Sequence, residues 1–194
     1  MCASSTIVDD VSRYCKSDPL LGIAFFYFDF QDKDALPHAV LRSLIKQLFL
    51  QCKVTPDALV KLYSECSDGQ RSPTLEGLIS TAKSIIQNFL NVYIILDALD
   101  ECPERNKLLK LLEVIHDWSI GTLHILVTSR KKRDIEVRLR RLVSYEVAMD
   151  EGDVDGDVRI HVSRVLDQDI EFQMFSAEEK QKIEATLVNG THGM

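Results

Sequence analysis

Three short apolar runs constrain the fold of this 194-residue chain more than any other feature. They are IAFFYFDF at 23–30, VYIILD at 92–97 and LHILVT at 123–128. None of them shows the strict polar and apolar alternation of a strand with one face in water. Strands buried on both faces have this character, and they occur in parallel sheets covered by helices. A weaker fourth strand candidate is the segment 144–148.

Segments with helical periodicity separate these runs. One apolar stripe extends from Val40 to Cys52 and a second from Leu75 to Phe89, each at three- and four-residue spacing. Residues 103–118 predict a further helix that begins at its proline. Strands that alternate with helices predict an α/β fold with three layers, in which helices flank a mostly parallel sheet.

Several pairs of residues predict helix ends. Thr55-Pro56 and Ser72-Pro73 each place a capping hydroxyl before a proline that suits a first helical turn. Near the C-terminus, Ser176 and Glu179 have the spacing of a capping box, and Gly190 is a stop signal.

Composition and length limit the class of protein. An apolar share of 45% with 27% charged residues is typical of a globular chain. The net charge of -7 argues against a surface dedicated to nucleic acid. Five widely spaced cysteines without a CxxC motif indicate reduced thiols. With no apolar stretch long enough to span a bilayer and no signal-peptide pattern, we expect a cytoplasmic protein without a membrane partner.

The acidic segment MDEGDVDGDV at 149–158 predicts a domain boundary. We expect a sheet domain at 1–150 and a helical segment at 151–194. The acidic residues are spaced somewhat like a calcium loop, but Val162 occupies the position where a bidentate glutamate is required. An acidic loop that caps the following helix is the better interpretation.

Carboxylates gather immediately after the second apolar run. Asp97 ends that run, and Asp100 and Glu101 follow within four positions. Ligands of parallel α/β sheets bind at the carboxyl ends of the strands. Since three neighbouring acids repel one another, the pattern favours a nearby cation such as Mg²⁺ with phosphate oxygens. Asp97 would hold the ion, directly or through water, and Asp100 or Glu101 would orient an attacking water. Alternatively, the acids only stabilise the N-terminus of the next helix.

The stretch VYIILDALDEC at 92–102 resembles the Walker B segment of NACHT-type NTPases of the STAND class, in particular fungal NOD-like-receptor proteins with a nephrocystin-like module. Four further stretches match that family in the same order, namely STIVDDV at 5–11, AFFYFDFQD at 24–32, LRSLIKQL at 41–48 and LHILVTSR at 123–130. The resemblance is collinear over essentially the whole chain.

This resemblance implies a P-loop NTPase core that switches a larger signalling receptor. It implies that ATP or GTP binds with Mg²⁺ through Asp97, and that hydrolysis is slow and assisted by Asp100 or Glu101. Ser129 and Arg130 end the VTSR segment, where the family places a polar or cationic sensor of the γ-phosphate. The partners implied are a nucleotide and the proteins of a signalling assembly. A surface arginine at a strand end is the plain alternative for Arg130.

The chain departs from the family at the phosphate loop. In the family, GxxxxGK[ST] immediately precedes the segment that resembles STIVDDV, whereas no glycine precedes Gly22 here. The amides and lysine of that loop supply most of the grip on the phosphates. The resemblance therefore implies a sheet that lacks its first strand, with three main strands and with 144–148 loosely placed or displaced into the vacancy. Nucleotide binding would be weak or absent.

Two other interpretations remain open. The chain could be a catalytically inactive remnant that serves as an interaction scaffold, or a truncated gene product without an independent role. An in-frame GxxxxGK[ST] upstream of the Met1 codon would favour the switch. At the other end, LVNGTHGM at 187–194 resembles the start of the family's continuation toward a winged-helix region. The basic run at 130–141 is interpreted as a solvated helix face.

Overall fold

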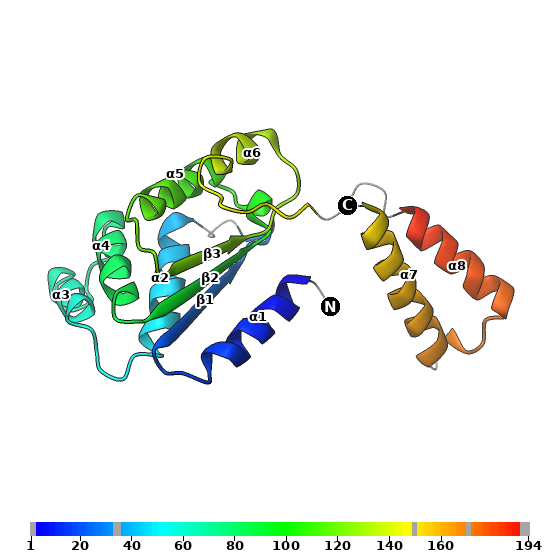
Figure 1. The fold of residues 1–194 in the computed structure, drawn as a ribbon, viewed down its shortest axis with the longest axis horizontal. Coiled ribbons are helices and arrows are strands. Elements are labelled where there is room, and N and C mark those ends of the chain that lie inside the picture. Colours follow the sequence, from blue (N-terminus) through cyan, green and yellow to red (C-terminus); the bar gives the residue numbers. More distant parts are fainter. Residues whose placement is uncertain (1–2, 33–35, 149–150, 170–171, 191–194) are drawn as a thin grey trace. The chain divides into compact units, whose positions relative to one another are not determined.

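A computed structural model describes residues 3–32, 36–148, 151–169 and 172–190. The chain divides into two compact units, Met1–Val143 and Ser144–Met194. The first contains the sheet, and the second contains two helices (Figure 1). The boundary predicted at residue 150 falls outside the described residues.

The sheet has three parallel strands in the order β1-β2-β3. They are β1 (Leu21–Tyr27), β2 (Asn91–Asp97) and β3 (Leu123–Val127). The ladder runs from Leu21↔Asn91 to Tyr27↔Asp97 on one side of β2 and from Val92↔Leu123 to Leu96↔Val127 on the other. The three apolar runs are therefore confirmed as strands of a parallel sheet.

The first strand ends earlier than expected. The sequence suggested a strand to residue 30, but β1 ends at Tyr27. Its partner β2 ends at Asp97, and the backbone N–H of Phe28 makes the last bond of the ladder to the Asp97 carbonyl at 3.0 Å. In the described part of the chain no strand lies beside residues 29 and 30, so an apolar composition alone does not keep them in the sheet.

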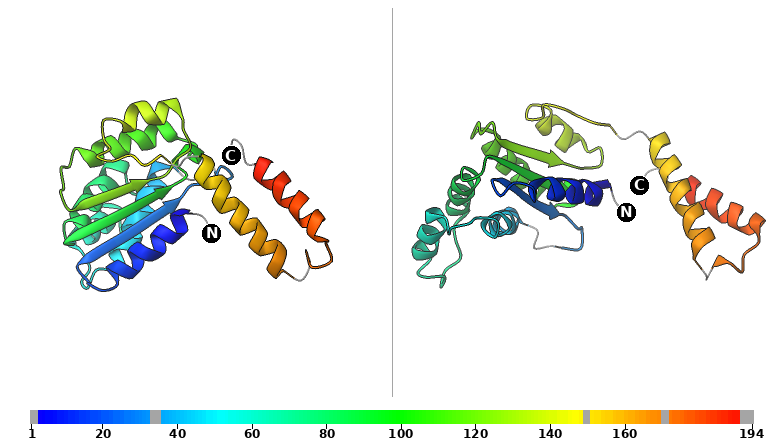
Figure 2. Two further views of the ribbon diagram at one scale, coloured as in Figure 1. Left: turned by 45° about the vertical axis from the view of Figure 1, so that its right-hand side comes forward. Right: turned by 60° about the horizontal axis from the view of Figure 1, so that its bottom comes forward.

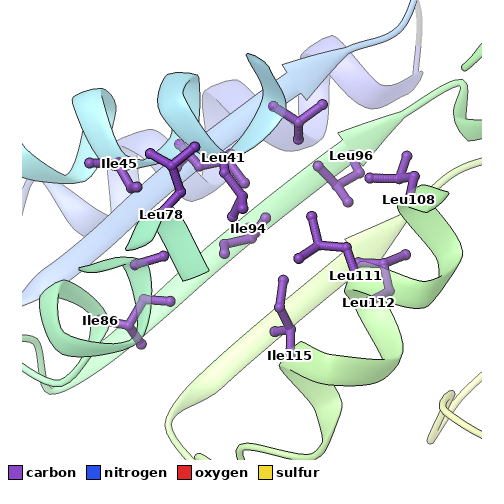
Figure 3. Packing of buried hydrophobic residues seen from close by; sticks show 14 of the residues in the cluster. Leu41, Ile45, Leu78, Ile86, Ile94, Leu96, Leu108, Leu111, Leu112 and Ile115 are labelled. Carbon is purple, nitrogen blue, oxygen red and sulfur yellow. The ribbon is translucent and has the colours of Figure 1, made fainter. Parts of the chain in front are cut away.

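Helices flank the sheet. In the first unit these are α1 (Ala3–Cys15), α2 (Pro37–Phe49), α3 (Asp57–Glu65), α4 (Leu75–Ile86), the short η1 (Leu99–Glu101), α5 (Arg105–His116) and α6 (Arg133–Leu139). Alternate residues of β2 project to opposite faces. Ile94 and Leu96 pack with α2, α4 and α5 (Figure 3). Helix α1 runs along the other face (Figure 1 and Figure 2).

Three predicted helix starts are wrong. Thr74, and not Ser72, caps α4, because its hydroxyl accepts a hydrogen bond from the Gly77 N–H at 3.1 Å. Helix α3 is preceded by Pro56 without a side-chain cap, so Thr55 does not act as one. Helix α5 begins at Arg105, two residues after its proline. The ring of a proline disfavours the helical conformation of the residue before it, and Cys102 is accordingly extended, with ψ 125.

The outer edge of β1 is covered by two glutamine side chains. Gln47 of α2 accepts from the Phe25 N–H at 3.1 Å and donates to the Phe25 carbonyl at 2.8 Å. Gln51, in the turn after α2, makes the same pair of bonds to Ile23 at 3.0 and 2.6 Å. A side-chain amide offers both N–H donors and a carbonyl acceptor, so it can bond the N–H and the C=O of one strand residue as a neighbouring strand would. The two glutamines therefore take the place of a neighbouring strand.

Helix α2 lies close to β1 because Gly22 has no side chain. A Cβ atom there would lie 3.1 Å from both Leu48 Cδ2 and Phe89 Cδ1, closer than ordinary van der Waals contact. This close approach allows Gln47 and Gln51 to reach the strand backbone.

The second unit consists of α7 (Glu151–Gln168) and α8 (Ala177–Gly190). The predicted capping box is confirmed, since the Glu179 carboxylate accepts from the Ser176 N–H at 2.8 Å and the Glu179 N–H donates to the Ser176 hydroxyl at 3.3 Å. The bonds that the Ser176 N–H and the Ser176 hydroxyl donate to the Glu179 carboxylate lower the pKa of Glu179. Glu184 of α8 accepts a hydrogen bond from the Ser163 hydroxyl of α7 at 3.0 Å.

Two expectations for this region are wrong. Residues 151–158 belong to α7 and do not form an acidic loop. Acidic residues near a helix N-terminus are stabilised by the helix dipole, which explains how this acidic sequence can be helical. The candidate strand at 144–148 is not part of the sheet, and Tyr145 and Val147 are 93% and 87% exposed. Among the described residues, no helix has the length and apolarity needed to cross a membrane.

The glutamine cover predicts a stability effect. We expect Gln51→Met to lower the free energy of unfolding of the first unit by about 1 to 2 kcal/mol, because the polar groups of Ile23 lose their partners in a partly buried position. Denaturation by urea, followed through the fluorescence of the single tryptophan, Trp118, measures this. The matched control is Gln87→Met at an exposed position. Equal stability of the two variants would contradict the assignment.

Candidate functional site

The carboxylates at 97–101 lie where β2 leaves the sheet. Val92, Ile94, Ile95 and Leu96 are all at most 4% exposed, so they fix the strand and set Asp97 at its carboxyl end. The next residue, Ala98, has φ 56 in the left-handed region, which is uncommon for a residue with a Cβ. Leu99 then returns to the core and is fully buried.

Thr128, which follows β3, fixes this turn. Its hydroxyl accepts from the Ala98 N–H at 3.0 Å, and its carbonyl accepts from the Leu99 N–H at 2.9 Å. The same hydroxyl donates to Asp97 Oδ1. The strained backbone of Ala98 is thus compensated by bonds to one residue, which also orients the Asp97 carboxylate.

Asp100 and Glu101 are brought together with Arg130. Asp100, whose side chain is 6% exposed, accepts from the Arg130 N–H at 3.0 Å, and its Oδ2 lies 3.8 Å from Arg130 Nε. Glu101 Oε1 lies 3.7 Å from Arg130 Nη2, and its Oε2 accepts from the Phe30 N–H at 3.3 Å. The side chain of Arg130 is 59% exposed, so these ion pairs are screened and individually weak.

Ser129 does not share this arrangement. Its hydroxyl donates to the Arg130 carbonyl at 2.7 Å and is exposed. The structure therefore places four of the five predicted site residues in two contact groups, Asp97 with Thr128 and the pair Asp100 and Glu101 with Arg130. Ser129 lies between Thr128 and Arg130 in the sequence, but its hydroxyl bonds to a backbone carbonyl.

Sequence reasoning missed two features of the site. Thr128 could have been found from the strand register. Leu96 pairs with Val127, so the next residues of the two strands, Asp97 and Thr128, are neighbours. Arg105 had no such signal. Its Nη1 donates to the Asp100 carbonyl at 2.9 Å and its Nε to Asp134 Oδ2 at 2.7 Å, which links η1 to α6. Arg105 also holds the pKa of Asp134 below its usual value, mainly through this hydrogen bond.

Cys102, next to the acids, is buried at 3% exposure. Burial raises the pKa of its thiol and so disfavours the nucleophilic thiolate.

Of the three carboxylates at this edge, only Asp97 is suited to hold a Mg²⁺ ion. No group of three or more His, Cys, Asp or Glu side chains in the described part of the chain is arranged to hold a metal. Mg²⁺ bound with a nucleotide needs only one or two carboxylates, since water and phosphate oxygens complete its shell. Asp97 fits that requirement, whereas Asp100 and Glu101 are already engaged by backbone N–H groups and Arg130.

Comparison with known proteins adds one match. A family model described as "Nephrocystin 3, N-terminal" matches residues 2–130, about two thirds of the chain and the whole span from α1 to Arg130. A search of curated proteins found no match.

The Arg105–Asp134 contact predicts a pH dependence. A carboxyl group whose pKa is lowered on folding stabilises the fold above its unfolded pKa, and this contribution is lost as the pH falls through the folded value. We expect Asp134→Asn to cost about 0.5 to 1 kcal/mol at pH 7, a modest figure because Asp134 is 40% exposed. The difference from the wild type should shrink below about pH 4.

Urea denaturation of both proteins between pH 7 and pH 3 checks this prediction, with Asp117→Asn at an exposed helix end as the control. A difference that stays constant over the whole pH range would contradict it.

Proposed function

This chain belongs to the nephrocystin 3 N-terminal family, and on that premise we propose that it is part of a NACHT-type nucleotide-binding module of a signalling switch. The ligand would be ATP or GTP with Mg²⁺. The observation that carries the proposal is the hydrogen bond between Thr128 and Asp97, which orients a carboxylate at the carboxyl ends of two neighbouring parallel strands. Nucleotides bind at this edge in open α/β sheets.

The direction of α1 also supports a nucleotide site at the carboxyl ends of the strands. The helix runs antiparallel to β1, so its N-terminal end lies toward the carboxyl ends of the strands (Figure 1 and Figure 2). A helix N-terminus favours anions such as phosphate. Asp97 and the start of α1 would therefore approach a magnesium phosphate from two sides, the carboxylate toward the metal and the helix toward the phosphate.

The residues would divide the work at this edge. Asp97 would hold Mg²⁺ directly or through water, and Thr128 keeps its carboxylate in place. Arg130, which lies near Asp100 and Glu101, would contact the γ-phosphate, and Ser129 is its neighbour in the sequence. Asp100 and Glu101 remain the candidates for orienting water. When bound, the metal would supply the positive charge that lets phosphate and carboxylate lie close together.

The open side of β3 supports the P-loop interpretation. In the described residues only β2 pairs with β3, and Ile125 and Leu126 are 37% and 39% exposed. In P-loop NTPases of this type, a further strand lies there and leads into the phosphate loop. The printed sequence contains no GxxxxGK[ST] motif, so we expect residues 1–194 alone to bind nucleotide weakly.

The same open edge favours a second candidate function. An unpaired strand edge is a template for another chain, so the protein could act as an interaction scaffold without nucleotide. Nucleotide binding separates the two functions.

Asp97→Asn tests the proposal. We expect fluorescent ATP or GTP analogues to bind the purified chain with Mg²⁺, and we expect the substitution to weaken this binding about tenfold or more, because a charge-assisted metal contact is lost. Asp117→Asn, at an exposed acid that follows α5, is the matched control and should bind as the wild type does. Binding that is absent at millimolar nucleotide, or that is equally strong in the Asp97→Asn and Asp117→Asn variants, would leave only the scaffold function.

A further inference from the structure

A groove on the surface formed by α2, α3 and α4 is not used by the site described above. It has a volume of about 520 Å³. Its base consists of Ile45, Leu62 and Leu78, which are all at most 9% exposed. Figure 3 shows Ile45 and Leu78 on neighbouring helices. Phe49, Leu59 and Pro73, which are half-buried, also line it.

The charged residues that line this groove are both cations. Arg42 and Lys46 lie one helical turn apart on α2, and both are exposed. No lining residue is acidic, although the chain as a whole carries a net charge of -7. Among the described residues, neither cation forms an ion pair at 4.0 Å or less. An apolar trough with two adjacent cations therefore faces solvent.

We propose that this groove binds an amphipathic α-helix of a partner protein. The apolar side chains of that helix enter the groove, and two acidic residues one turn apart on it face Arg42 and Lys46. Grooves between helices commonly receive such helices, whose anchor residues recur at three- and four-residue spacing. Charge complementarity selects the acidic partner and its orientation.

The cations and the apolar residues line the same groove, which favours a helix over an extended peptide. On a helix, acidic residues four apart and apolar residues at neighbouring positions can share one face. On a strand, successive side chains point to opposite faces, so the residue next to an acid that faces Arg42 or Lys46 would point away from the groove. The volume of about 520 Å³ admits several apolar side chains.

Selection from a peptide library tests the proposal. The library consists of amphipathic peptides of about 16 residues, long enough to form a helix, with a fixed apolar stripe and randomised polar positions. It is selected against the purified 194-residue chain. We expect enriched peptides to carry an acidic pair at i, i+4 and to bind less tightly as salt increases.

The charge reversal Arg42→Glu/Lys46→Glu should weaken binding of an enriched peptide by about tenfold, since two attractive pairs become repulsive. The control Lys110→Glu/Lys132→Glu changes the net charge equally at exposed positions on other segments and should leave the dissociation constant within about twofold. Replacing the acidic pair of the peptide by lysines should restore binding to the reversed variant.

Three results would overturn the proposal. They are the absence of any enriched peptide, enriched peptides without acidic residues, and binding that the two double variants weaken equally. Because all four substituted residues are exposed, loss of folding does not confound the comparison, and the circular dichroism of each variant confirms this.

Discussion

The double pairing of β2 is the constraint on which the rest of the first unit depends. β2 pairs with β1 over seven residues and with β3 over five, and its side chains are buried on both faces. Strand β2 ends at Asp97, opposite the last residue of β1 and one residue beyond its last pair with β3. The carbonyl of Asp97 accepts from Phe28 and its carboxylate accepts from Thr128. The candidate site is a direct consequence of how the core strand terminates.

The two edges of the sheet differ in their chemistry. At β1, side-chain amides of Gln47 and Gln51 satisfy the strand backbone, so that edge does not offer a template to another chain. At β3, the described residues provide no such cover, and the strand contains no Asp, Glu, Lys or Arg. Helix α2 serves both the sheet and the surface, since its glutamine contacts β1 while its cations line the groove toward α3 and α4.

Local chemistry made much of this fold predictable. The three strands follow from apolar runs rich in β-branched and aromatic residues, and α2 and α4 follow from their apolar stripes. Helix starts were less predictable. Thr55 and Ser72 carry hydroxyls that could cap a helix, but only Thr74 is placed so that its hydroxyl accepts from the first turn of α4. The segments 144–148 and 151–158 were misread because their composition does not reveal what packs against them.

The site shows the same limit. Asp97, Asp100, Glu101 and Arg130 were predicted from order along the chain, and the structure brings them to one edge. Thr128 depends on strand register, and Arg105 with Asp134 depends on how α5 and α6 pack. Contacts between residues about 30 positions apart leave no mark in a local motif. Sequence alone therefore located the acids but not the groups that orient them.

The most direct test of the central claim is a titration of the labelled chain with Mg²⁺ and ATP or GTP, followed by backbone amide chemical shifts. The account predicts that the largest changes occur at the carboxyl edge, at Ala98, Leu99 and Arg130, whose N–H groups belong to the hydrogen-bond network around the acids. The amides of Leu21, Asn91 and Leu123, at the opposite end of the strands, should change little. Changes centred on that opposite end, or none at millimolar nucleotide, would contradict a nucleotide site at the carboxyl edge.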